Sequence, residues 1–248
     1  MISRLCIGLV LALGLTSTAL AADVKILAPN AAKEAVLEAI SVFEKATGHK
    51  VLVSWSGTEA ITKRVADGEK VDLVVNAAQN IDRQSSDGKL IASTRTDFAR
   101  SGIGVAVPAS STKVDVSTSE AIRALLVSAP SVLVSSGTSG RHMVDMFAKL
   151  GVGEQLKAKT KQPPSGAQIA ESLASGEATV GFQQVSELIH AKGIQYLGPL
   201  PADLQNYTVY SAAVHASATD VEAVKQLLAA LRSASVQAVV RSTGMEPM

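Results

Sequence analysis

The sequence has little cysteine, few aromatic residues and no excess of charge of either sign. Its one cysteine, Cys6, lies in the first 21 residues, so the rest of the chain offers no disulfide, thiol nucleophile or cysteine metal ligand. Arg4 is one of the 23 basic residues, which leaves 22 basic against 22 acidic side chains in residues 22–248. A neutral chain with 3% aromatic residues has neither the basic face nor the stacking surface of a nucleic-acid-binding protein.

The N-terminus has the pattern of a cleavable secretion signal. One basic residue, Arg4, precedes an apolar run over residues 5–15, and the small-residue triplet 19–21 follows. A membrane anchor is the alternative, but the run has about half of the roughly 20 residues that a spanning helix needs. We therefore predict a signal peptide over residues 1–21, with cleavage after Ala21 and export of the remaining chain.

Strand-like and helix-like segments alternate along the exported chain. Apolar runs such as 24–28 and 71–75 are each followed by a segment with helical spacing of apolar residues. This alternation predicts α/β layers with mainly parallel sheets, and it restarts after Pro108. We expect two lobes, the first formed by residues 22–106 plus 208–248 and the second by residues 107–207, with two crossovers of the chain between them.

Short polar loops connect the predicted strands to the helices that follow. They lie at residues 29–31, 56–58, 137–140 and 164–166. The N-terminus of a helix offers unpaired N–H groups and a partial positive charge, so several such loops at one cleft would form an anion site. The same residue types also serve as ordinary N-caps, and this alternative stays open for each loop.

Two further features are candidates for ligand contact. Arg141 lies in the first turn of a predicted helix, where a cation is unfavourable, so it is either a clamp for a carboxylate or a solvated surface residue. Gln183 and Gln184 end a predicted strand, where their amides could bind a ligand or cap a turn.

Motifs for catalysis and for metal binding are missing from the sequence. The four histidines are scattered without metal-ligand spacing, and neither a nucleophile elbow nor a phosphate loop occurs. A secreted hydrolase using Ser136 or Ser139 is an alternative, but no His and Asp partners accompany these serines. We therefore expect a protein that is not an enzyme and that holds no metal and no cofactor.

Several short segments in a fixed order carry a resemblance to a known family. They are ILA at 26–28, FEKATGHKV at 43–51, ADG at 66–68 with VDLVV at 71–75, AKLG at 148–151, GEA at 176–178 with VGF at 180–182, and GMEP at 244–247. With these segments the chain resembles the periplasmic solute-binding proteins of ABC transporters, in particular the molybdate-binding branch. The resemblance covers nearly all of the exported chain, and it implies two α/β lobes of the type II binding-protein fold that close on an anion.

The resemblance also implies positions for the ligand contacts. Two positions lack the family's side chain, because Ala31 stands where a serine is expected and Gln184 where a tyrosine is expected. The other three matching positions are Thr58, Ser139 and Gly166, and additional polar groups come from Asn30, Arg141 and Gln183.

These departures favour a ligand other than the family's oxyanion, namely a small organic acid. Molybdate or tungstate remains the open alternative. The resemblance further implies a periplasmic monomer that delivers its ligand to an ABC permease in the inner membrane. A sensor that signals to a receptor would share the same fold.

Overall fold

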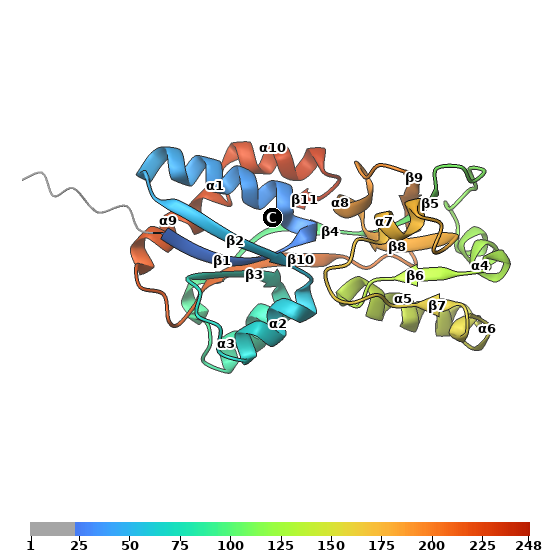
Figure 1. Cartoon of the computed structure of the whole chain (residues 1–248), viewed down its shortest axis with the longest axis horizontal. Coiled ribbons are helices and arrows are strands. Elements are labelled where there is room, and N and C mark those ends of the chain that lie inside the picture. The colour runs from blue at the N-terminus through green and yellow to red at the C-terminus, as the bar shows by residue number, and fades with distance from the viewer. Residues whose placement is uncertain (1–22) are drawn as a thin grey trace, which may run out of the picture.

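The computed structural model describes residues 23–248, so the predicted signal peptide lies outside the described residues. The chain forms two α/β lobes side by side, each built on its own sheet (Figure 1). The strand order is β11-β4-β10-β3-β1-β2 in the first sheet and β7-β6-β8-β5-β9 in the second. The predicted two-lobed fold is thereby confirmed.

The first lobe packs helices on both faces of its sheet, because alternate residues of its buried strands point to opposite sides. Ile26 and Ala28 of β1 face one core and Leu27 faces the other. The strands are β1 (Asp23–Pro29), β2 (Lys50–Ser56), β3 (Leu73–Ala77), β4 (Thr96–Ser101), β10 (Thr208–Val214) and β11 (Glu246–Pro247). The helices are η1 (Asn30–Ala32), α1 (Lys33–Thr47), α2 (Thr58–Ala66), α3 (Ala78–Ser86), η2 (Ala92–Thr94), α9 (Val221–Ala230) and α10 (Ala234–Ser242).

The second lobe is smaller and has the same layered plan. Its larger core lies around Phe182 and Met143, and a smaller core lies on the opposite side of the sheet around Leu173. The strands are β5 (Ile103–Pro108), β6 (Val132–Val134), β7 (Thr160–Lys161), β8 (Val180–Gln184) and β9 (Ile194–Pro199). The helices are α4 (Ser119–Ser128), α5 (Thr138–Lys149), α6 (Gly153–Lys157), α7 (Ile169–Ala174) and α8 (Val185–Leu188).

The sheets are mixed, which corrects the expectation of mainly parallel sheets. In the first sheet β1 is parallel to β2 and β3, but β10 is antiparallel to β3 and β4. In the second sheet β6 is parallel to β7 and β8, but β5 is antiparallel to β8 and β9. The reason lies in the crossovers. Strand β5 enters the second sheet at the edge where β8 ends, and β10 enters the first sheet at the edge where β3 ends, so each runs antiparallel to that neighbour.

The chain crosses twice between the two sheets. Only Gly102 separates β4 from β5, so the chain passes almost directly from one sheet to the other. It returns through residues 200–207 into β10. Because β5 already pairs with β8 from Ile103, the second sheet begins four residues before the boundary expected at residue 107.

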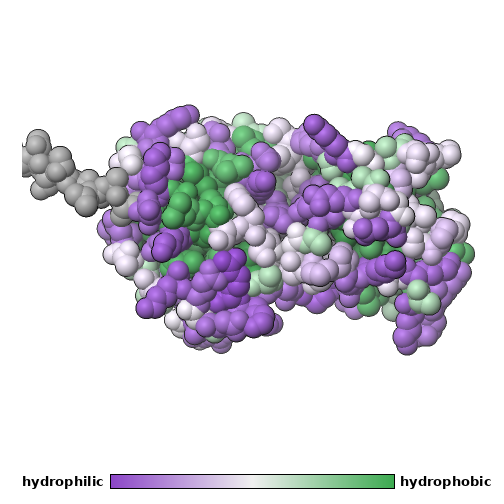
Figure 2. Space-filling model, in the orientation of Figure 1, coloured by the Kyte–Doolittle hydropathy of each residue, from purple (hydrophilic) through white to green (hydrophobic). Residues whose placement is uncertain are grey.

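The edge strand β2 exposes apolar side chains. Leu52 is 51% exposed on β2 and Leu37 is 41% exposed on the neighbouring helix α1. Figure 2 shows a hydrophobic area over this side of the first lobe, while the surface where the two lobes meet is mainly hydrophilic. No helix within residues 23–248 is both long enough and apolar enough to span a membrane.

Candidate functional site

A small cavity of about 50 Å³ lies between the lobes, where β1, β2, β6 and β8 end. Residues of both lobes line it, and among the described residues no lysine, arginine or histidine does so. The lining consists of Pro29, Asn30, Ala31, Ser56, Gly57, Thr58, Ser135, Ser136, Gly137, Thr138, Ser139, Pro163, Pro164, Ser165, Gly166, Ala167, Gln183, Gln184, Glu187 and Tyr210. An anion in this cavity would be held by neutral hydrogen-bond donors.

Two helices of opposite lobes begin at the cavity, and glycine stands at the cap position of each. Gly57 precedes α2 and Gly137 precedes α5, so neither cap residue has a side chain to satisfy the first N–H groups. Among the helices that begin away from the cavity, the side chains of Thr118, Asp220 and Ser233 cap α4, α9 and α10, whereas α3 and α6 have no side-chain cap. Ordinary N-capping therefore does not account for the loops at α2 and α5.

The first turns of α2 and α5 keep donors available. The third N–H of each helix is bound to a serine hydroxyl. Ala60 N donates to Ser165 Oγ of the opposite lobe at 3.2 Å, and Gly140 N donates to Ser135 Oγ of its own loop at 3.2 Å. In the part of the chain that the structure describes, the two N–H groups before each of these, at residues 58–59 and 138–139, have no partner. These four N–H groups, with the positive ends of two helix dipoles, form the core of a candidate anion site.

Hydroxyl groups add to this set of donors. Thr58, which is buried, keeps its hydroxyl free of hydrogen bonds within residues 23–248 while lining the cavity. The Ser136 hydroxyl is buried without a partner there, although a buried unpaired hydroxyl is unfavourable unless a ligand satisfies it. Ser139 is 3% exposed, and its Oγ lies 2.8 Å from Ser135 Oγ.

The lobes touch at glycine residues on either side of the cavity. The N–H of Gly166 lies so near Gly57 that a Cβ at Gly57 would stand 2.5 Å from it. Asn30 Nδ2 donates to the carbonyl of Gly166 at 3.0 Å, and Ser186 Oγ donates to the carbonyl of Ala31 at 2.7 Å. The structure is therefore a closed arrangement, and the side chain of Asn30 serves that closure.

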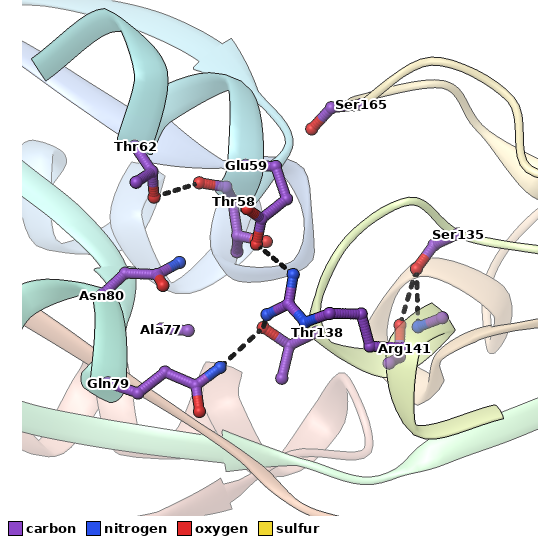
Figure 3. Close-up of polar contacts among 12 residues, drawn as sticks. Thr58, Glu59, Thr62, Ala77, Gln79, Asn80, Ser135, Thr138, Arg141 and Ser165 are labelled. Carbon is purple, nitrogen blue, oxygen red and sulfur yellow. Dashed lines mark hydrogen bonds and ion pairs between the residues drawn. The ribbon is translucent and has the colours of Figure 1, made fainter. Parts of the chain in front are cut away.

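Figure 3 shows polar contacts between α2 and α3 of the first lobe and α5 of the second. The guanidinium of Arg141 pairs with Glu59 at 2.5 Å, and Gln79 Nε2 donates to Thr138 Oγ1 at 3.5 Å. Of the two alternatives for Arg141, the structure has the surface position, because Arg141 is exposed and is not among the lining residues. The partner that offsets its unfavourable helix position is Glu59, from the other lobe.

The two glutamine amides at the end of β8 are engaged within the protein. Gln183 accepts a hydrogen bond from the N–H of Ile169 at 3.2 Å and donates to Glu187 Oε1 at 2.9 Å. The Gln184 amide lies 2.9 Å from the Thr208 hydroxyl, and its nitrogen reaches the carbonyl of Ser101 at 3.0 Å when oriented to satisfy both groups. Gln184 thus connects the two crossovers rather than presenting a free amide to the cavity.

Two lining residues with strongly perturbed ionisation were not expected from the sequence. Burial raises the pKa of Glu187 to about 8. Burial and the nearby Glu187 raise the pKa of Tyr210 well above its ordinary value. Tyr210 comes from the returning strand β10 of the first lobe and supplies a phenol, which the resemblance had placed at position 184. The sequence could have indicated Glu187 only through its spacing, because it lies four residues after Gln183, whose amide it contacts.

The described residues around the cavity support neither a metal site nor a serine hydrolase. Within residues 23–248 no cluster of His, Cys, Asp and Glu could hold a metal ion. Ser136 and Ser139 have no histidine or aspartate beside them in the described lining, so the arrangement required for a serine hydrolase is missing there.

Two α/β lobes that close over a cavity lined by neutral hydrogen-bond donors at the strand ends define the type II fold of the solute-binding proteins. Residues 24–246 match the family model of the bacterial extracellular solute-binding proteins. The chain belongs to this family.

Comparison with individual proteins gives relatives of two kinds. An aconitate isomerase of Pseudomonas sp. is 30% identical over 219 residues, covering 86% of this chain and 83% of that protein. The molybdate-binding protein ModA of Azotobacter vinelandii is 26% identical, covering 95% of this chain and 96% of the relative. A solved periplasmic molybdate-binding protein of Azotobacter vinelandii, 18% identical, shares the fold with a TM-score of 0.75 and covers 90% of this chain and 98% of its own.

Proposed function

We propose that the protein binds a small organic acid in the cavity between its lobes and carries it to an ABC-type permease. The observation that supports this most strongly is the pair of helices, α2 and α5, that begin at one cavity from opposite lobes with glycine as the cap residue and two N–H groups unpaired in each. Helix ends and hydroxyls can hold an anion without a full countercharge, so the ligand stays releasable. Family membership and the anion named for each relative agree with this chemistry.

The side chains of the cavity favour an organic acid over a tetrahedral oxyanion. Ala31 and Gln184 replace two expected contacts, while Glu187 adds a carboxyl group that donates a hydrogen bond when protonated. A protonated carboxyl, a phenol and hydroxyls suit ligands with several carboxylate and apolar parts.

The setting of this function follows from the N-terminus and the family. A signal peptide over residues 1–21 would release the protein into the periplasm, where a monomer could diffuse between solute and permease. Lobe closure around the ligand is the working motion, and the contacts between Gly57 and Gly166 mark its closed end point.

Titration calorimetry decides between the ligand classes. The protein is unfolded and refolded to remove any copurified ligand, and it is then titrated with citrate, malate and trans-aconitate and separately with molybdate, tungstate and sulfate. We expect saturable 1:1 binding of at least one organic acid. Tight molybdate binding with no response to any organic acid would contradict the proposal and assign the protein to oxyanion uptake.

Isomerisation of an unsaturated organic acid is a second candidate function. The relative at 30% identity is named an aconitate isomerase, so the same fold is compatible with chemistry as well as carriage. The test is incubation of the purified protein with cis- or trans-aconitate, followed by separation of the two isomers. A conversion rate that scales with protein concentration would favour the isomerase, and binding without conversion would favour the carrier.

A further inference from the structure

Glu187 lies between the cavity that separates the lobes and a second, open groove, and it lines both. It lies in the short helix α8, directly after strand β8, and lines the cavity between the lobes. It also lines an open groove formed by α1, α7, α8 and α10. The other ionisable residues along that groove are Lys33, Glu34, Glu171 and His190. Within the described lining of the cavity between the lobes, Glu187 and Tyr210 are the ionisable residues, so no cation there holds the carboxyl in its ionised form.

The carboxyl group is oriented by one hydrogen bond and otherwise left available. Gln183 Nε2 donates to Oε1 at 2.9 Å, and the Gln183 amide is itself fixed by the N–H of Ile169. In the described chain no other hydrogen bond reaches this carboxyl, so Oε2 remains open to a ligand. Burial raises its pKa to about 8, which makes the ionised form a stronger base and keeps the protonated form common near neutral pH.

We propose that Glu187 is the acid–base residue of a proton shift on an unsaturated organic acid bound in the cavity. The proposal rests on organic-acid binding as the function of this cavity. The ionised carboxyl removes a proton from a CH₂ group next to a carbon–carbon double bond. The electron pair of the broken C–H bond forms a new double bond to the middle carbon, and the pair of the old double bond takes the proton back from Glu187 at the far carbon. The step is balanced without an oxidant, a reductant or a cofactor.

The rest of the cavity suits this reaction. Negative charge spreads over the three-carbon unit and its carboxylates as the proton leaves, and the unpaired N–H groups at the starts of α2 and α5 can stabilise it. Tyr210 adds a phenol whose pKa is raised, so it stays protonated and can donate. In propene-1,2,3-tricarboxylate both outer carbons carry a carboxylate, so the shift regenerates the same compound and allows its cis and trans forms to exchange.

The experiment uses the refolded full-length mature protein with cis- or trans-aconitate in D₂O, with isomers and deuterium content followed by NMR. We expect interconversion with deuterium entering the CH₂ and vinyl positions. Glu187→Gln keeps the hydrogen bond from Gln183 but cannot accept the proton, so the rate should fall at least about 100-fold while aconitate affinity changes only a few-fold. Glu187→Asp should recover part of the rate. Glu171→Gln is the matched control, because Glu171 lines the groove but not the cavity.

The possible results distinguish the role of Glu187 from the binding of organic acids. Binding of aconitate without isomerisation or deuterium exchange would overturn the role of Glu187 and leave the carrier function standing. Isomerisation that survives in Glu187→Gln would assign the proton transfer to another residue. A protein that binds no organic acid would overturn both proposals, and melting temperatures of the variants establish that each is folded.

Discussion

Replacing Gly57 with alanine should weaken ligand binding by blocking closure of the lobes. Gly57 has φ −87° and ψ 159°, which alanine adopts without strain, so the first lobe should fold normally. In the closed structure, however, the new Cβ would lie 2.5 Å from the backbone nitrogen of Gly166 and in collision with Ser165 Oγ. These atoms belong to the opposite lobe, so the methyl group keeps the lobes apart.

The size of the effect follows from the energy of such a collision. Inserting one methyl group where there is no room typically destabilises a packed arrangement by about 1–3 kcal/mol. Only the closed state suffers this loss, so the affinity should fall by roughly 5- to 150-fold, since each 1.4 kcal/mol is tenfold. Calorimetry measures the change in affinity, and the melting temperature without ligand should stay unchanged.

The control for this experiment is Gly153→Ala. A Cβ at Gly153 would meet its nearest neighbour at 3.5 Å, an ordinary contact within the second lobe and away from the cavity lining. We expect its affinity and melting temperature to match those of the unmodified protein. If Gly57→Ala bound the ligand as tightly as Gly153→Ala, the closed contact between Gly57 and Gly166 would have no part in ligand binding.

Three other changes test the cavity and its surroundings. Thr58→Val should weaken ligand binding by about 0.5–1.5 kcal/mol in calorimetry, because the lost hydroxyl is an unpaired donor at the cavity; an unchanged affinity would place the ligand elsewhere. Arg141→Gln removes the exposed ion pair with Glu59, so it should weaken ligand binding by at most about 1 kcal/mol in low salt and hardly at all in 0.5 M salt. A large loss of affinity that persists in high salt would instead indicate that Arg141 contacts the ligand directly. Because the pKa of Glu187 is raised, the folded chain holds one proton more than the unfolded chain between about pH 4.5 and 8. The free energy of unfolding should therefore fall as the pH rises through this window, by at most about 1.4 kcal/mol per pH unit. Denaturant titrations at several pH values should show this fall in the unmodified protein and not in Glu187→Gln.

Local sequence signals were sufficient for much of the fold. Gly48 and Gly68 each follow a segment with helical spacing of apolar residues, where glycine ends a helix, and both adopt the left-handed conformation, with φ +76° and +87°. The terminal segment also has helical spacing of apolar residues and forms α9 and α10. Strands β4 and β9 could not be predicted in this way, because 96–101 is largely polar and 194–199 contains Gly198, so neither has the apolar pattern of a buried strand.

The candidate site was predictable only where it depends on local structure. The loops before α2 and α5 were identified from their composition and do line the cavity. Arg141 drew attention because a cation at a helix N-terminus needs a partner, but only the fold reveals Glu59 as that partner. Tyr210 and Glu187 come from a returning strand and a four-residue helix of different lobes, so their proximity depends entirely on how the lobes close.

The neutral lining of the cavity also explains why closure and binding depend on one another. Each lobe contributes one uncapped helix, so an anion bound to an open protein would meet only about half of the available donors. A lysine or arginine in the lining would bind an anion strongly to one lobe alone and would slow its release, whereas partial charges from two lobes act together only when the lobes meet. That meeting requires backbone atoms of the two lobes to approach closely at Gly57 and Gly166, where a side chain would prevent it. The absence of countercharge and the presence of glycine at the contact therefore have one physical cause, an anion site that is complete only when closed.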